Sequence, residues 1–295
     1  MGTADLAQQL DALRSGRAFV DLTSWRKVRV GGTEAEEWLN DLLSAELSGL
    51  TPGRSVRSFL LSPTGRIRAD LTVAGTGLGT MLLQDPIQPP IDELLWPYVL
   101  SSDVELADVT RELTLIGVPG AGRAPSPAET ETLRPSCLGP GLDLLAPARL
   151  DADVRDALAG LVEASADAME AWRIERGAAR FGVDLGEASL PQEAGLDGIV
   201  AYQKGCFLGQ EAMARVRNLG HPPFLLLAAD GEGPARPGEA VLAGDQAVGT
   251  VTSAAALQGD GTAAIVRVRW GARDAELRTA GGTELRPTGR ASGAA

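Results

Sequence analysis

Apolar residues at helical spacing predict several helices in the first 220 residues. The stretch ADLAQQLDALRSG repeats leucine every three or four positions and stops at Gly16, a common residue after a helix end. The stretch EAEEWLNDLLSAEL carries an apolar stripe that starts at Trp38, and Thr33 with Glu36 matches the capping-box pattern before it. Further helices are predicted in PPIDELLWPYVL, DADVRDALAGLVEAS, DAMEAWRIERGAARFG and QEAMARVRN.

Strand patterns alternate with these helices. SVRSFLLSPTGRIRADLTVA predicts two strands joined by a tight turn at SPTG. VAGTGLGT fits a glycine-rich hairpin better than a nucleotide loop, because no GxGxxG motif leads into a helix. In the second strand, period-two alternation places Asp70 on one face with Arg66 and Arg68. That face is either a solvated salt-bridged surface or the wall of a site where an acid meets a polar ligand.

From Phe224 onward the pattern changes to short strands separated by glycine and proline. FLLLAAD, QAVGTVTSAAA and TAAIVRVRW predict a small all-β module. We therefore expect two parts, residues 1–221 and a C-terminal barrel-like part over 222–295 with a frayed tail.

Composition excludes several classes of function. The chain has 295 residues, a formal net charge of -12 and 44% hydrophobic residues, which argues against a nucleic-acid binder with a basic field. No apolar run reaches the roughly 20 residues of a membrane span, and the first residues lack the pattern of a signal peptide. One histidine and two cysteines cannot by themselves hold a metal centre or an iron–sulfur cluster. We expect a soluble, cytoplasmic protein that binds no metal, no nucleic acid and no membrane.

Cys206 has an unusual setting for a free cysteine. It lies between Gly205 and Gly209, with Lys204 two residues upstream and a predicted helix downstream. A cation and a helix start both favour the thiolate, so a reactive thiol is one interpretation, and a small buried hydrophobic residue is the other. Cys137, at the end of a loop rich in proline and serine, is interpreted as incidental.

The motif KGCFLGQE, residues 204–211, resembles the signature of the YgfZ family. YgfZ proteins bind folate, are linked to iron–sulfur cluster assembly and repair, and are related to the aminomethyltransferase (T-protein) of glycine cleavage. Three further blocks resemble the family in the same order: FVDLTSWRKVRVGGTEAEEWLNDLLSAEL, LSPTGRIRADLTV and WRIERGAARFGVDLGEASLPQEAGL. T-proteins typically carry aspartate where this chain has Cys206, so the thiol favours the YgfZ side.

The resemblance implies an α+β cloverleaf. Two interleaved α+β subdomains and a small C-terminal β-barrel would surround a hole that takes tetrahydrofolate. Trp25 matches a folate-contacting tryptophan, and Glu175 matches an acid that engages the pterin ring in T-proteins. A carboxylate can accept paired N–H bonds from such a ring. Lys204, Cys206 and Gln210 of the motif are the candidate catalytic residues, and we expect Cys206 beside the folate cavity rather than in the core.

Two positions depart from the relatives. Where T-proteins carry two acids after the turn, this chain has Ala69 and Asp70, so we expect Asp70 to contact folate without the proton-transfer chemistry of a pair. Met169 stands where some family members place a second tryptophan. Trp172 lies three residues later on a similar helical face and could replace it.

The leading functional hypothesis is therefore a tetrahydrofolate-binding accessory protein for iron–sulfur cluster biogenesis or repair. Its working thiol would be Cys206, and its partners would be iron–sulfur enzymes or cluster assembly proteins that bind transiently. The alternative is a tetrahydrofolate-dependent one-carbon (aminomethyl) transferase or demethylase. A third hypothesis is a folate-binding module in which Cys206 is only structural.

Overall fold

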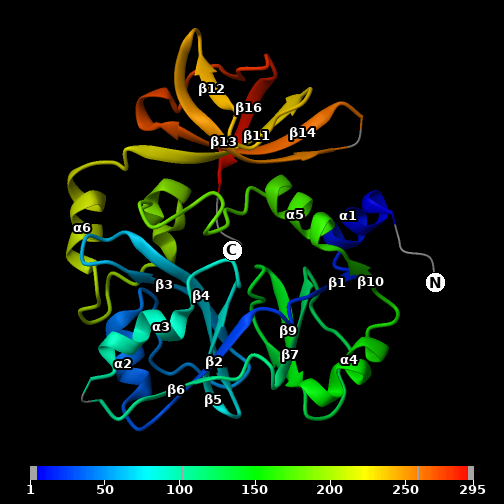
Figure 1. The fold of residues 1–295 in the computed structure, drawn as a ribbon, viewed down its shortest axis with the longest axis vertical. Helices are drawn as coiled ribbons and strands as arrows, with labels where there is room; N and C mark the ends of the chain where they lie inside the picture. The colour runs from blue at the N-terminus through cyan, green and yellow to red at the C-terminus, as the bar shows by residue number, and fades with distance from the viewer. Residues whose placement is uncertain (1–4, 101, 258, 292–295) are drawn as a thin grey trace.

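Two five-stranded sheets and a closed six-stranded barrel make up the fold (Figure 1). The structure is a computed structural model that describes residues 5–100, 102–257 and 259–291. The predicted fold class, an α+β cloverleaf with a small C-terminal β-barrel, is confirmed by this arrangement.

The two sheets are interleaved along the chain. The first has the strand order β10-β1-β7-β9-β8 and the second β3-β4-β5-β2-β6, so the chain leaves the first sheet after one strand, builds the second and then returns. The first sheet consists of β1 (Ala18–Asp21), β7 (Leu113–Pro119), β8 (Glu131–Leu133), β9 (Gly141–Pro147) and β10 (Val162–Ala164). The second consists of β2 (Arg26–Gly31), β3 (Ser55–Leu61), β4 (Ile67–Thr76), β5 (Gly79–Gln84) and β6 (Glu105–Asp108). Within these sheets β10 runs parallel to β1 and the other pairs are antiparallel.

Helices cover both sheets. The helices beside the first sheet are α1 (Leu6–Arg14), α4 (Asp151–Ala157) and α5 (Ala166–Glu175), with the 3-10 turn η2 (Ala148–Leu150). Those beside the second are α2 (Ala35–Leu42), α3 (Ile91–Leu95) and the 3-10 turn η1 (Trp96–Tyr98). α1 packs against α5, and their apolar faces share one core with the first sheet. The stripe on α2 that begins at Trp38 is buried against the second sheet, as its spacing predicts.

Three predicted helix features are wrong. Thr33 forms no capping box, because its hydroxyl and its backbone N–H both donate to Asp103, at 2.6 and 3.0 Å. The helix predicted through EAEEWLNDLLSAEL also ends early, at Leu42. The helix predicted through DADVRDALAGLVEAS ends at Ala157. Its last residues instead form β10, where Val162 donates its backbone N–H to the carbonyl of Arg17 at 3.0 Å. Pairing with a neighbouring strand outweighs helical spacing there.

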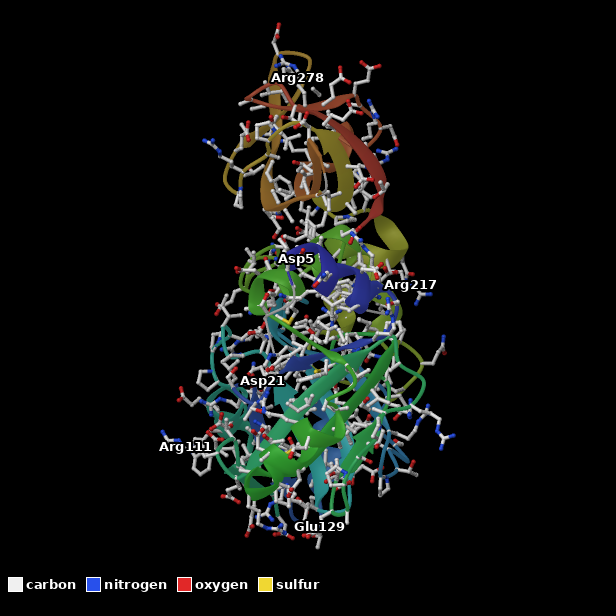
Figure 2. All side chains as sticks on the ribbon, turned by 90° about the vertical axis from the view of Figure 1, so that its right-hand side faces the viewer. Asp5, Asp21, Arg111, Glu129, Arg217 and Arg278 are labelled. Atoms are coloured by element: carbon white, nitrogen blue, oxygen red, sulfur yellow. The ribbon has the colours of Figure 1, made fainter. Side chains whose placement is uncertain are left out.

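The barrel lies at one end of the molecule, above both sheets (Figures 1 and 2). Its strands are β11 (Phe224–Glu232), β12 (Ala240–Ala243), β13 (Gln246–Ala256), β14 (Gly261–Arg269), β15 (Leu277–Thr279) and β16 (Glu284–Arg290), with the 3-10 turn η5 (Trp270–Ala272). The chain reaches the barrel through the 3-10 turns η3 (Pro191–Ala194) and η4 (Leu196–Ile199) and then α6 (Gln210–Leu219). Phe59, Phe181 and Ile265 share an apolar core that joins the barrel to the rest of the fold.

Long polar side chains such as those of Arg111 and Arg217 project from the outer surface (Figure 2). None of the helices in the described ranges has the length and apolar character needed to cross a membrane.

Candidate functional site

A cavity lies where the two sheets, α5 and the segment after α5 meet. The space, counted together with the open solvent at its mouth, is about 710 Å³. The lining residues come from the link between the sheets, from β3, β4 and the loop after β5, from the β8–β9 loop, and from α5 with its following segment. They are Trp25, Arg57, Asp70, Leu71, Thr72, Asp85, Gln88, Cys137, Leu138, Met169, Trp172, Arg173, Ala178, Ala179, Arg180 and Phe181.

Apolar side chains form much of the wall. Met169 and Trp172 come from α5, where a spacing of three residues puts them on similar faces, and Trp25 comes from the turn between β1 and β2. Trp172 is 4% exposed, and Arg176 covers its ring with the guanidinium carbon 4.4 Å from the ring centroid. Such a wall is suited to a flat, partly apolar ring.

Asp70 and Arg57 form the polar pair of the cavity. Arg57 Nε donates to Asp70 Oδ1 at 2.8 Å, and Arg57 Nη2 donates to Asp70 Oδ2, so the pair is bidentate. Burial disfavours the charge of Arg57, but the neighbouring carboxylate outweighs it and raises the pKa of the guanidinium. Gln88 holds the strand beneath, since its amide accepts from the backbone N–H of Asp70 at 2.9 Å and donates to its carbonyl at 2.8 Å. The pair therefore presents donors and acceptors side by side.

The surroundings of Asp70 distinguish the two interpretations of its strand face, a solvated surface or the wall of a site. The side chain of Asp70 is 11% exposed, and its partner is Arg57 on the neighbouring strand rather than Arg66 or Arg68. Arg66 donates to the carbonyl of Ala188 instead. Asp70 therefore lies in a cavity wall and not on a solvated surface.

Two further arginines line the cavity, and one of them, Arg173, ties it to the barrel. Arg180 binds Asp85 through two bonds of 2.6 and 3.1 Å. Arg173 Nη1 donates to the buried Asp184 at 2.8 Å, and Arg173 Nη2 donates to Ser253 Oγ of β13, also at 2.8 Å. Ser253 Oγ donates in turn to Asp184 Oδ1 at 2.6 Å. Both carboxylates that line the cavity, Asp70 and Asp85, are thus bound by arginine.

The β8–β9 loop supplies the wall at Cys137. Asp143, which has no exposed surface, accepts from Ser136 Oγ at 2.5 Å and from the backbone N–H of Cys137 at 2.8 Å. Burial raises the pKa of Asp143 to about 6 despite these hydrogen bonds. Burial, and then the Asp143 carboxylate, raise the pKa of the Cys137 thiol. Cys137, interpreted from the sequence as incidental, is therefore part of the cavity wall.

Glu175 does not lie among the cavity residues. Arg14 of α1 donates to its carboxylate through Nε at 3.0 Å and Nη2 at 2.8 Å, next to solvent. The expected placement of Glu175 beside Trp25 and Asp70 is corrected, because the packing of α1 on α5 offers this carboxylate an arginine outside the cavity.

The KGCFLGQE segment is a separate place on the molecule. Cys206 is exposed, as a reactive thiol requires, but neither it nor Gln210 lines the cavity. Lys204 Nζ donates to the carbonyls of Asn40, Leu43 and Ala45, each at 2.6 Å, at the C-terminal end of α2. Lys204 therefore anchors the loop to α2, and its ammonium is committed to these carbonyls rather than to the thiol. The position of Cys206 beside the cavity, expected from the sequence, is corrected in the same way.

Comparisons with known proteins bear on this geometry. Residues 3–124 match a family model described as the GCVT N-terminal domain. The aminomethyltransferase of Thermosynechococcus vestitus is 27% identical over 283 residues, which cover 85% of this chain and 76% of the relative. That of Streptomyces coelicolor is 26% identical over 282 residues, with 83% and 76% covered. The solved glycine cleavage system aminomethyltransferase T from Bartonella henselae superposes with a TM-score of 0.80 at 19% identity, covering 96% of this chain and 87% of that one.

The chain has the T-protein fold. The matched model is that of a GCVT N-terminal domain and the relatives are aminomethyltransferases, and neither singles out the YgfZ group.

Within the T-protein fold, four of the residues predicted from the sequence to bind the cofactor meet in one cavity: Trp25, Asp70, Met169 and Trp172. Their contact with a ligand stays a prediction. Sequence reasoning missed Arg57, although the predicted turn at SPTG brings two strands together and the polar face of one carries an unpaired acid. It also missed Arg180 and Gln88, which lie in loops whose sequence gives no sign of their partners.

Among the residues that the structure describes, no three histidine, cysteine, aspartate or glutamate side chains gather where they could hold a metal ion.

Proposed function

We propose that the cavity binds the pterin ring of a tetrahydrofolate, and that the chain is a folate-dependent one-carbon (aminomethyl) transferase or demethylase. The observation that carries this proposal is the combination, in one cavity, of the wall of Trp25, Met169 and Trp172 with the Asp70–Arg57 pair. The similarity to aminomethyltransferases supports this reaction class.

The residues present fit this ligand. A pterin ring is flat and carries N–H donors next to ring-nitrogen and carbonyl acceptors along one edge. The indoles and the Met169 thioether can cover its faces. Each Asp70 oxygen keeps lone-pair capacity beyond its bond to Arg57, and the guanidinium has further N–H donors, so the pair can match that edge.

Calorimetric titration with tetrahydrofolate tests the binding. We expect one saturable site in the wild type and an affinity at least about tenfold weaker in Asp70→Asn, which loses the charge-assisted acceptor. Glu175→Gln is the matched control, with affinity within about twofold of the wild type, because Glu175 lies outside the cavity. The absence of saturable heat in the wild type would overturn the proposal.

Turnover is measured separately. With an aminomethyl donor, the methylene carbon forms bonds to two folate nitrogens while its bonds to the amine nitrogen and to the donor's carrier break, and the two folate N–H protons leave with ammonia and with the carrier. With a quaternary N-methyl donor, the methyl group forms one bond to a folate nitrogen, the tertiary amine leaves and the folate N–H proton is released. The appearance of one-carbon-substituted tetrahydrofolate from aminomethyl or N-methyl donors would establish the transferase. Binding without turnover for any of these donors would leave a folate-binding protein of another kind.

We infer a second candidate function from the exposed thiol. Cys206 lies on a loop that Lys204 fixes to α2, away from the cavity, where a large partner can reach it. This setting supports the YgfZ-like hypothesis of a cytoplasmic, folate-binding accessory protein for iron–sulfur cluster biogenesis or repair. It also fits a reducing compartment, since both cysteines are free.

Complementation of a deletion strain tests the second candidate. Cys206→Ser should abolish support of iron–sulfur enzymes while tetrahydrofolate binding stays intact. Cys137→Ser is the paired control, because it removes the other free thiol and should retain support of those enzymes; since Cys137 lines the cavity, its tetrahydrofolate binding is measured beside the complementation. Full complementation by Cys206→Ser would return this thiol to a structural role and leave the transferase as the proposal.

A further inference from the structure

Trp25 reaches the cavity from a short turn between the two sheets. The turn links β1 to β2. Thr23 donates its backbone N–H to Asp21 Oδ1 at 2.8 Å, its hydroxyl lies 3.2 Å from Thr114 Oγ1 on β7, and Trp25 donates its backbone N–H to the carbonyl of Leu22 at 2.8 Å. Trp25 is half-buried and is the cavity residue that comes from this link. The carbonyls of Thr23 and Trp25 take no part in these bonds, so the group that binds these carbonyls also fixes the position of Trp25.

Lys27 holds the turn. Its side chain has no exposed surface, although it carries an ammonium group. Nζ donates to the carbonyl of Thr23 at 2.8 Å, to that of Trp25 at 2.9 Å and to that of Thr110 at 3.3 Å. The three N–H bonds of the ammonium thus match three carbonyls, two of which belong to the turn.

The backbone of Lys27 is fixed as well. It lies opposite Leu83 in the second sheet, and its N–H donates to Thr110 Oγ at 3.0 Å. No carboxylate in the described structure forms a direct ion pair with Nζ, so a charge is buried on carbonyls alone. Burying a charge is costly, and an apolar residue would fill the same space with less penalty. The ammonium supplies what an apolar residue cannot, which is three directed bonds beneath Trp25.

We propose that Lys27 is a positioning residue that fixes Trp25 in the wall of the cavity, and that loss of its proton loosens this wall. The part that concerns ligand affinity rests on the proposed function, whereas the part that concerns Trp25 does not.

The charged surroundings of Lys27 set the direction of the effect. Burial lowers the pKa of Lys27 to about 8, and the more distant Asp108 on β6 and Asp21 on β1 raise it in part. Those two acids are themselves bound, Asp108 by Arg26 at 2.9 Å and Asp21 by Arg155 at 2.6 Å. A neutral amine has two N–H bonds and a lone pair, so it cannot donate to all three carbonyls. The turn should therefore loosen as the pH rises through about 8.

Global stability should move the opposite way. The pKa of Lys27 in the folded protein lies below that of an unfolded lysine, so between these two values the unfolded chain holds more protons. The contribution of Lys27 to the free energy of unfolding accordingly rises with pH in that window. If Lys27 only stabilised the fold, Trp25 would not become more mobile over the pH range in which the contribution of Lys27 to the free energy of unfolding increases.

Fluorine NMR of protein labelled with 5-fluorotryptophan tests the proposal without any ligand. The chain has five tryptophans, and Trp25→Phe assigns the resonance of Trp25. We expect this resonance in the wild type to titrate with a midpoint of about 8. It should not titrate in Lys27→Met. Lys204→Met is the matched control, since it removes another partly buried ammonium of pKa about 8, which binds carbonyls at the end of α2, and the Trp25 titration should persist in it.

Ligand affinity gives the second readout. At neutral pH, tetrahydrofolate should bind Lys27→Met and Trp25→Phe each about tenfold more weakly than the wild type, and the double variant no more weakly than either, because both changes act through one indole. Two results would overturn the proposal even if Lys27→Met fails to fold. One is a Trp25 resonance whose chemical shift does not change with pH in the wild type, and the other is loss of its titration in Lys204→Met. If the wild type binds no folate, the proposed function fails, and the resonance alone then decides the role of Lys27.

Discussion

At the scale of single residues, the cavity depends on charges that are buried and directed. Asp70 is bound by Arg57, and Asp85 by Arg180, so neither carboxylate meets a ligand as an unpaired charge. Asp143 differs, because its partners are a hydroxyl and a backbone N–H and it has no cation to offset burial. Asp143 binds the loop that carries Cys137 into the cavity wall. Burying its charged form lowers the free energy of unfolding by an amount that depends on pH.

Asp143→Asn should reveal this cost. The pKa of Asp143 in the folded protein, about 6, exceeds that of an unfolded aspartate. The folded state therefore holds the proton more tightly, and stability is lost as the pH rises from about 4 to 6. A shift of about two pKa units corresponds to roughly 3 kcal/mol. In urea unfolding, the variant should gain about 1–2 kcal/mol over the wild type at pH near 7.5 and nothing at pH near 4.

Asp151→Asn provides the control with the opposite sign. Arg155, followed by Thr114, lowers the pKa of Asp151 below its usual value. Its contribution to stability is therefore present at neutral pH and lost on acidification, so this variant should be less stable than the wild type at neutral pH. Equal pH profiles for Asp143→Asn and the wild type would contradict the assignment of a strained, buried Asp143.

At the scale of elements, the end of α2 and the Cys206 loop form one unit. The last carbonyls of a helix lack hydrogen-bond donors within the helix. At the end of α2, Lys204 donates to the carbonyls of Asn40 and Leu43 from a segment more than 150 residues away along the chain. Burial lowers the pKa of Lys204 to about 8, as burial does for Lys27. Two lysines thus fasten two loops, one with the cavity tryptophan and one with the exposed thiol.

Lys204→Met should release the loop. The substitution leaves three carbonyls without their donor, which we expect to cost about 1–3 kcal/mol of stability. Hydrogen exchange should rise in the peptides over 39–47 and 200–210 and stay unchanged in the barrel strands. Lys204→Arg keeps the charge but cannot place three bonds in the same geometry, so it should rescue only part of the loss. Unchanged exchange in both peptides would show that the loop is held by other contacts.

Helical spacing predicts which side chains share a face of a helix but not which partners they meet. Met169 and Trp172 could be placed together from their spacing on a helix. The same spacing relates Trp172 to Glu175, yet Glu175 meets Arg14 outside the cavity. Periodicity gives the face of a helix but not the cation that a distant element brings to it. The partners of Lys27 and Lys204 could not be predicted either, because they are backbone carbonyls and every residue type has one.

At the scale of the whole molecule, three of the six barrel strands (β11, β13 and β14) and the hairpin at SPTG could be predicted from local alternation and turn residues. The interleaving of the two sheets could not, since it rests on pairings between distant strands such as β1 with β10. It entered only through the resemblance of sequence blocks to a known family. The cavity is a product of that interleaving, because its walls come from strands of the second sheet, from the β1–β2 link and the β8–β9 loop, and from α5.

A crystal structure of the chain with tetrahydrofolate is the most direct test of the central claim. Our account predicts the pterin ring against Trp25, Met169 and Trp172, with its polar edge at Asp70 and Arg57. Soaked crystals of Asp70→Asn should show lower occupancy at the same place. Tetrahydrofolate bound elsewhere on the chain, or a cavity that stays closed to it at saturating concentration, would contradict the account.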